Sequence, residues 1–200
     1  MCETYAGVFD SACCALRTGD NSLGNLKASS FGAEQISGSN RFTAGFRTDS
    51  SGYVLSSVTA LIEQDMPGTL NLALYANTTM QPPNQLGNLA VPAILPSFFG
   101  RVTFSGNHLM LAPNTTYWIV MGTPVSSSYE WAFEDAKAAS GVGFYSSWGM
   151  SQNSGNSWFT NAEQPMQMSV IGTPIPQPVT VWPVLLGGAA LTGTRFRNHA

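Results

Sequence analysis

Histidine is the side chain that most often acts as a general base, and this chain has two of them. His199 lies next to the C-terminus, so a Ser-His-Asp triad would have to use His108. His108 ends the segment 105–108, whose Gly and Asn favour a hairpin turn. The sequence contains neither a Gly-x-Ser-x-Gly elbow nor a His-Glu-x-x-His helix. We therefore interpret His108 as an exposed turn residue.

Pairs of carboxylates could hydrolyse a glycosidic bond, because that reaction uses two of them on either side of the bond. The nearest pairs in the sequence are Glu63 with Asp65 and Glu130 with Glu134. Since the first pair flanks an expected turn, solvated surface charges explain these residues more simply than catalysis does. No Asp-x-Asp-x-Asp-Gly calcium loop occurs. Three further aspartates could still seat a cation in a loop: Asp10, Asp20 and Asp49.

Cysteines occur at three positions near the N-terminus, namely Cys2, Cys13 and Cys14. The adjacent pair has neither the spacing nor the histidine companions of a zinc site, so we expect no bound metal. Outside the cytoplasm a disulfide could join Cys2 to either of the other two. Buried free cysteines are an equal alternative.

Tryptophan gives the better lead towards a binding function, because exposed Trp and Tyr rings can stack on sugars. Trp148 and Trp158 lie in residues 146–160, a stretch rich in Ser, Asn and Gly that could supply hydrogen-bond partners. These two are the candidate glycan contacts, and packing within a loop is the simpler alternative. Trp118 and Trp131 lie in strand-like segments and are expected in the core.

The amino-acid composition argues against a nucleic-acid partner and indicates a single hydrophobic core. Only 10% of the residues are charged, compared with about 25% in an ordinary soluble domain. With a net charge of -3 and only eight Lys plus Arg, the chain has no basic stripe to neutralise phosphates, so we expect no nucleic-acid partner. A hydrophobic content of 44% over 200 residues is enough for one core with an appendage.

Segments of alternating polarity predict strands. Residues 41–47 predict a half-buried strand with an apolar face of Phe42, Ala44 and Phe46. Residues 54–63 predict another, whose inward set is Val54, Val58, Ala60 and Ile62. After a turn at residues 65–68, residues 69–75 predict a third, with Leu70, Leu72 and Leu74 inward. We predict that the second and third strands pair as a hairpin.

Shorter strands are predicted in the rest of the chain, at residues 101–104, 109–111, 117–122, 129–133, 142–145 and 166–171. Prolines make residues 77–84 a loop, and residues 132–140 are the one segment with helical character. Eight or nine short strands in series predict an all-β fold, a β-sandwich of jelly-roll type.

The composition changes near residue 172. Residues 1–172 are the expected β-sandwich domain, and the prolines of residues 173–178 predict an extended, unpaired linker. Residues 179–200 are expected to form a short hydrophobic helix with a basic end. As a helix, the sixteen uncharged residues 179–194 would cover roughly 24 Å of a hydrocarbon core of ~30 Å. A marginal membrane anchor with the sandwich outside is expected, and a last core strand with a frayed end is the alternative.

This order of proline motif, apolar helix and terminal arginines resembles the PEP-CTERM sorting domain of Gram-negative bacteria. Pro176-Gln177-Pro178, preceded by Pro174, stands where the family has Pro-Glu-Pro, so Gln177 is a departure from the motif. Arg195 and Arg197 stand in the place of the basic end. The resemblance implies an exosortase-like processing enzyme as a partner.

The preceding domain resembles the choice-of-anchor family of exported β-domains, close to type R, over about residues 8–172. The resembling stretches are residues 8–11, 55–58, 72–75, 111–120 and 166–170. This resemblance implies an exported, surface-bound or matrix-associated architecture, and it implies no reaction and no cofactor.

Three functions are therefore weighed. The first is a non-catalytic exported surface or extracellular-matrix protein, associated with biofilm or exopolysaccharide and held in the membrane by its tail before processing. The second is a carbohydrate-binding module that uses Trp148 and Trp158. The third is a glycoside hydrolase, which needs two carboxylates about 5 to 10 Å apart in a cleft. No signal peptide is visible at Met1, so export requires an upstream signal, and a cytosolic protein is the alternative.

Overall fold

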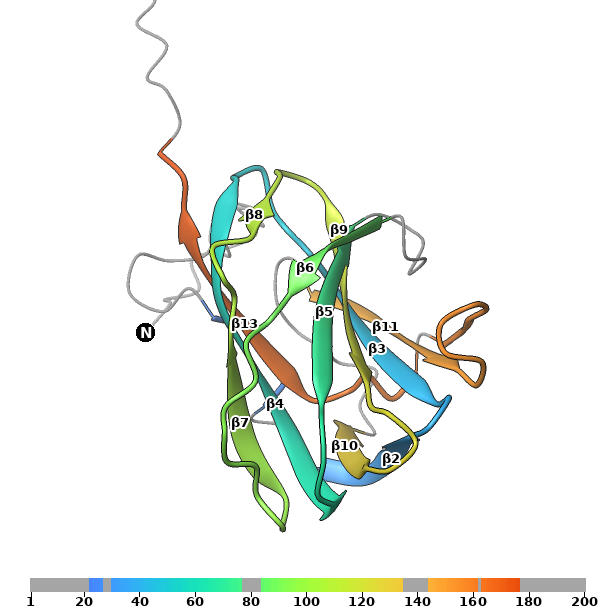
Figure 1. Ribbon diagram of the computed structural model, residues 1–200. Helices are drawn as coiled ribbons and strands as arrows, with labels where there is room; N and C mark the ends of the chain where they lie inside the picture. Colours follow the sequence, from blue (N-terminus) through green and yellow to red (C-terminus); the bar gives the residue numbers. More distant parts are fainter. Residues whose placement is uncertain (1–21, 27–29, 77–83, 135–143, 162, 177–200) are drawn as a thin grey trace, which may run out of the picture.

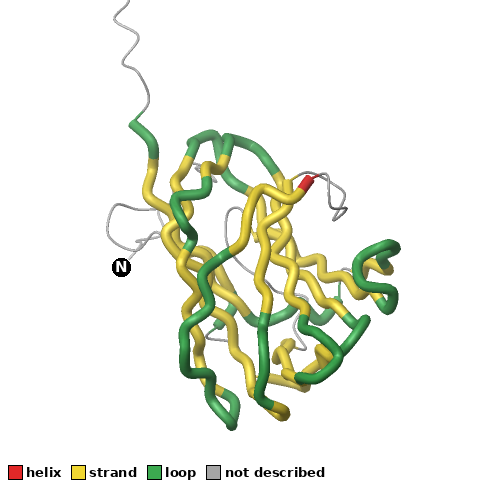
Figure 2. The backbone as a smooth tube through the Cα atoms, in the orientation of Figure 1, coloured by secondary structure: helices red, strands yellow, loops and turns green. Residues whose placement is uncertain are grey.

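The computed structural model describes residues 22–26, 30–76, 84–134, 144–161 and 163–176. Two antiparallel sheets pack against each other (Figure 1), and strand and loop account for almost all of the described chain (Figure 2). The prediction of an all-β sandwich is confirmed, and the jelly-roll type stays a prediction. Within these residues, no helix has the length and apolar character needed to cross a bilayer.

The described residues form thirteen strands. The seven-stranded sheet contains β1 (Ser22–Gly24), β2 (Ser30–Ser37), β4 (Tyr53–Met66), β7 (Gly100–Ser105), β8 (Met110–Leu111), β10 (Ser128–Glu134) and β13 (Met168–Pro174). The six-stranded sheet runs in the order β12 (Phe159–Asn161), β11 (Phe144–Ser151), β3 (Arg41–Arg47), β9 (Thr116–Gly122), β5 (Asn71–Ala76) and β6 (Gln85–Asn88).

Strand β4 organises the seven-stranded sheet. Along one side it pairs first with β13 and then with β10, and along the other side with β7 and β8. Because β7 and β8 follow the same side of β4, the turn between them is a local excursion rather than the hairpin turn predicted for residues 105–108. Asn107 and His108 occupy this turn with φ of 48° and 57°, a region in which Asn is among the more tolerated residues.

The hydrophobic core fills the space between the sheets. Its largest fully buried side chains are Trp131, Tyr129, Phe42, Phe46 and Phe104. The leucines predicted to point inward from residues 69–75, which are Leu70, Leu72 and Leu74, are all buried in this core, as the alternating pattern indicates.

The predicted hairpin between residues 54–63 and 69–75 is wrong. The first segment lies in β4 and the second in β5, and these strands belong to opposite sheets (Figure 1). The turn at Pro67-Gly68 carries the chain across the core instead of back along β4. Alternation shows which side of a strand is buried, but it does not show which strand lies beside it.

Two details of burial also differ from the predictions. Val54 is only half-buried, and Tyr53 and Leu55 point inward in its place. An irregularity in the pairing with β13, between Ile171 and Gly172, shifts the alternation before Val58, because a bulge moves side chains to the opposite face. Strand β3 is not half-buried, since all residues from 42 to 46 are buried and both of its faces are covered.

Some strands of the structure were not predicted, and others have different bounds from the predicted ones. The segments β1, β2, β6 and β12 were not predicted, and β11 runs on from the predicted 142–145 to Ser151. Residues 132–134, predicted as the start of a helix, belong to β10, and the remainder of that segment lies outside the described residues. Residues 173 and 174, predicted as the start of the unpaired linker, are paired with β4 instead, and the Ile175 amide donates to the Gly52 carbonyl at 2.9 Å.

Candidate ligand-binding groove

The outward face of the six-stranded sheet carries a second group of buried apolar side chains. This outer cluster consists of Ala73, Tyr75, Trp118 and Val120, with the half-buried Trp158 packed against it. An antiparallel sheet whose other face packs on a core usually presents polar residues outward. The central strands β5 and β9 instead present apolar residues on both faces, which marks this face as unusual.

A groove of about 680 Å³ lies over this face. We call it the outer groove. Its floor is formed by β9 and β5 through residues that include Val120, Ala73 and Tyr75, and its sides carry amide and hydroxyl groups. The polar lining side chains are Ser39, Arg41, Thr69, Asn71, Gln85, Asn88, Thr123 and Ser154. This combination of an apolar floor with convergent polar groups is typical of small-ligand sites.

Arg41 is the one charged side chain among the described residues that line the outer groove. A methyl group built on Gly122 would lie 3.1 Å from the Arg41 Cγ, and one built on Gly155 would lie 3.4 Å from its Nη1. The stem of Arg41 therefore lies along Gly122 and its guanidinium reaches Gly155. Within the ranges that the structure describes, no carboxylate forms an ion pair with this guanidinium.

One wall of the outer groove is held by a chain of hydrogen bonds. The Tyr75 hydroxyl donates to Gln85 Oε1 at 3.1 Å, and Gln85 Nε2 donates to Asn88 Oδ1 at 2.9 Å. The Asn88 backbone carbonyl accepts a further bond from Asn107. Burial raises the pKa of Tyr75, partly opposed by the positive charge of Arg41. Tyr75 therefore stays a neutral hydroxyl donor at neutral pH.

The loop 152–158 beside the groove is fixed by its own hydrogen bonds. The Ser151 hydroxyl accepts from the Gly155 amide at 2.8 Å, and the Asn153 side chain bonds both the amide and the hydroxyl of Ser157. Trp158 Nε1 donates to the Gly155 carbonyl at 3.1 Å. Gly155 has a φ of 91°, which side chains rarely adopt, so glycine suits this position. The loop is held in shape before any ligand arrives.

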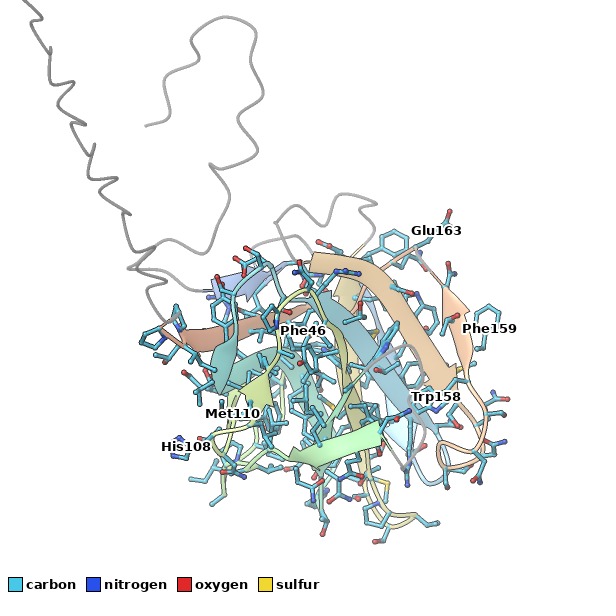
Figure 3. The ribbon with its side chains drawn as sticks, turned by 90° about the horizontal axis from the view of Figure 1, so that it is seen from above. Phe46, His108, Met110, Trp158, Phe159 and Glu163 are labelled. Atoms are coloured by element: carbon cyan, nitrogen blue, oxygen red, sulfur yellow. The ribbon has the colours of Figure 1, made fainter. Side chains whose placement is uncertain are left out.

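The two tryptophans predicted as glycan contacts lie in different places. Trp148 is on strand β11 rather than in a loop, stacks on Phe42 with ring centroids 6.1 Å apart, and packs against the core. Its indole donates to the Glu163 carbonyl. Trp158 belongs to the outer cluster and lies on the opposite side of the molecule from His108 (Figure 3). The structure therefore brings only Trp158 near the groove.

The two tryptophans expected in the core are both buried. Trp131 is completely buried between the sheets, as predicted. Trp118 is 4% exposed but belongs to the outer cluster, so it lies beneath the groove face and not in the main core.

The carboxylates pair differently from the sequence-based pairs. Glu63 and Glu130 lie directly opposite each other across β4 and β10, and Asp65 is close enough to raise the pKa of Glu130. Glu134 lies elsewhere, buried and bonded to Asn25. No Asp or Glu is among the described residues that line the outer groove, and no metal-binding group of three or more His, Cys, Asp or Glu occurs in the described ranges.

Replacing Glu130 by Gln is expected to stabilise the domain at neutral pH. Burial, followed by the charges of Asp65 and Glu63, raises the pKa of Glu130 above its ordinary 4.5. Between the unfolded and folded pKa values the folded state binds more protons, so stability falls as the pH rises through that window. We expect a gain of a few tenths to about 1 kcal/mol, from like charges lying opposite in a sheet.

Thermal melting of the two proteins across the acidic range tests this expectation. The gain should disappear below the ordinary pKa of a glutamate, where Glu130 is protonated in both states. Replacing the exposed Gln35 by Glu, opposite Glu130 on β2, should have the reverse effect because it adds another like charge. A pH-independent gain for Glu130→Gln would show that charge repulsion is not its cause.

The other predicted site residues are placed as follows. His108 is exposed, as predicted, and lines a separate hollow beside β4 and β7. Asp49 Oδ1 accepts hydrogen bonds from the Ser51 amide and the Tyr53 hydroxyl, at 2.8 and 2.9 Å, so it closes a local turn. Pro174 ends β13 opposite Tyr53, and Pro176 is exposed. The remaining ones lie outside the described residues: Cys2, Asp10, Cys13, Cys14, Asp20, Gln177, Pro178, Arg195, Arg197 and His199.

Most of the groove residues could not be predicted from the sequence. Asn71 and Tyr75 were visible on the polar side of residues 69–75, but nothing in the alternation showed that β6 and β3 would bring Asn88 and Arg41 to the same face. Fold and groove together define a β-sandwich domain with a polar groove on an aromatic-floored sheet face. No protein-family model matches the chain, and no curated protein sequence matches it.

Proposed function

We propose that this chain is a non-catalytic, exported surface or extracellular-matrix protein whose outer groove binds carbohydrate. The observation that carries the binding part is the arrangement of the groove itself, in which amide and hydroxyl side chains surround an aromatic and aliphatic floor. Sugar rings present hydroxyl groups at their edges and C–H groups on their faces, so they suit such a lining. The volume of about 680 Å³ lies in the range of known ligand sites and leaves room for a few sugar residues.

The fixed geometry of the site supports the same proposal. The chain of hydrogen bonds from Tyr75 to Asn88 and the internally bonded loop 152–158 position the polar groups in advance. A preorganised site loses less conformational entropy when a ligand binds, which matters for the weak hydrogen bonds that sugars make in water.

The exported location is supported by the order of the proline motif, apolar stretch and arginines in the tail. An exosortase-like enzyme as processing partner, transient anchoring in the membrane and association with biofilm or exopolysaccharide are parts of this proposal. Cell fractionation of bacteria that express the protein from its own gene, with the β-sandwich domain detected by an antibody, tests it. Retention of the full-length protein in the cytosol would contradict the surface assignment while leaving the groove to be tested separately.

Changing Asn71 and Asn88 together to Ala is expected to weaken polysaccharide binding by roughly tenfold or more, because each lost hydrogen bond contributes about 0.5–1.5 kcal/mol. Both side chains are exposed, so the fold should persist. Affinity electrophoresis through gels that contain neutral or acidic polysaccharides measures the change. The control is Gln35→Ala, an exposed amide on the other sheet. Equal retardation of both variants and the unchanged protein would place binding elsewhere.

A further inference from the structure

We infer that the outer groove selects carboxylated polysaccharides, such as polymers of uronic acids, and that Arg41 is the residue that binds their carboxylates. This inference rests on the proposed function, because it names the class of ligand for the same groove. Its first observation is that Arg41 is the one charged side chain among the described residues that line the groove.

The charge pattern of the groove is opposite to that of the chain. The protein has a net charge of -3, yet no described acidic residue lines the groove and Arg41 does. Arg41 is half-buried, and among the residues placed by the structure no carboxylate neutralises it. A neutral sugar needs no cation, whereas a guanidinium offers a planar pair of donors that matches a carboxylate.

Arg41 is also held in place by packing instead of by an acid. Gly122 leaves room for its stem on the neighbouring strand β9, and the guanidinium lies beside Gly155 at the edge of the loop 152–158. The donors of the guanidinium therefore stay available for a ligand. The uncharged groups of Ser39, Asn71 and Ser154 line the same groove, where they can bond the hydroxyls of the same sugar.

The experiment compares acidic polymers with the same polymers after chemical reduction of their carboxyl groups. Polygalacturonate and alginate are used with their carboxyl-reduced forms, and affinities are measured by titration calorimetry and affinity electrophoresis. We expect the unmodified protein to bind an acidic polymer on the order of 10- to 100-fold more tightly than its reduced form, as a charge-assisted hydrogen-bond pair provides. Arg41→Gln should lose this preference and Arg41→Lys should keep part of it.

Arg47→Gln is the matched control. Arg47 lies on the same strand and, at an even spacing from Arg41, on the same face, roughly 20 Å away, and it does not line the groove. This variant should bind like the unmodified protein, and unchanged melting temperatures for all variants would show that the fold is intact.

The possible failures are distinguishable. Equal binding of acidic and reduced polymers, or an equal loss for both in Arg41→Gln, would overturn the selection of carboxylates and leave carbohydrate binding standing. Absence of binding to every polymer, acidic or reduced, would overturn the proposed function and this inference together.

Discussion

Replacing Asn25 by Leu is expected to lower the free energy of unfolding by about 2 to 4 kcal/mol, because it removes the partner of two buried hydrogen-bonding groups, each of which costs about 1–3 kcal/mol when left unsatisfied. Asn25 Nδ2 donates to Glu134 Oε1 at 3.0 Å, and its Oδ1 accepts from the Met168 amide at 2.8 Å. Glu134 is 1% exposed and Asn25 is 8% exposed, so water cannot readily replace these bonds. Chemical denaturation followed by circular dichroism measures the loss.

Asn25→Asp separates the loss of hydrogen bonds from a general loss of packing. The two side chains have nearly the same shape, but the aspartate would face the carboxylate of Glu134. Burial beside another carboxyl group raises the pKa of the introduced aspartate in the folded state, so this variant should regain stability as the pH falls towards the ordinary carboxyl range. An Asn25→Leu protein as stable as the unchanged one would show that this network does not hold β1 and β10 to β13.

The second large effect is expected for Trp131→Ala, with a loss of about 3–5 kcal/mol, as for other large-to-small changes in a core. Trp131 is completely buried, and its Nε1 donates to the Gln167 carbonyl at 2.9 Å. It lies on β10, which joins β2 to β4 in the seven-stranded sheet. Removing it opens a cavity at the point where these strands meet.

Trp158→Ala is the control for this prediction. The same change at a half-buried residue of the outer cluster should cost only about 1 kcal/mol. Equilibrium unfolding in urea compares the two variants. Trp131→Phe should fall between them, because the phenyl ring fills much of the space but lacks the indole N–H that donates to the Gln167 carbonyl. A larger loss at position 158 than at position 131 would mean that the outer cluster, and not the space between the sheets, is the main source of stability.

The sequence predicted the positions of the strands better than it predicted which strands pair with each other. The period of two at Leu70, Leu72 and Leu74 correctly identified a strand and its buried side, because burial of alternate residues depends on that strand alone. Strand β5 lies between β6 and β9, and β9 is more than forty positions further along the chain, so no local pattern encodes that pairing. The hairpin prediction failed for this reason.

The short edge strands were missed for a different reason. Strand β6 has little apolar content, and its residues Gln85 and Asn88 are exposed. Such strands are defined by hydrogen bonds to a neighbour that is already in place, here β5, rather than by their own alternation. The polar residues that make them hard to predict are the ones that they contribute to the outer groove.

The candidate site was predicted in part. Trp158 was singled out because a tryptophan among Ser, Asn and Gly suggests a binding loop, and it does lie against the outer cluster. Trp148 had the same surroundings in the sequence, but it lies on β11 and faces Phe42. The deciding difference is that Trp148 points from β11 towards the main core, whereas Trp158 lies in the loop 152–158 against the outer cluster. The side to which Trp148 points became visible only once β11 was paired with β3.

Arg41 was the least predictable member of the site. It begins a strand whose predicted polar side was unremarkable. Its position in the groove depends on contacts with Gly122 and Gly155, which are distant in the sequence. A side chain at Gly122 would crowd the Arg41 stem, whereas Gly155 is required by its backbone φ of 91° and lies in ordinary contact with the guanidinium. The groove therefore depends on a small residue at position 122 as well as on polar ones.

Binding of carbohydrate in the outer groove is tested most directly by a heteronuclear NMR titration with oligosaccharides of the polymer that binds most tightly. We expect the signals of the Trp158 indole and of the side-chain amides of Asn71, Gln85 and Asn88 to shift together and saturate, while the indole signals of Trp131 and Trp148 stay unchanged. Shifts confined to the seven-stranded sheet, around His108 or Glu130, would contradict this expectation.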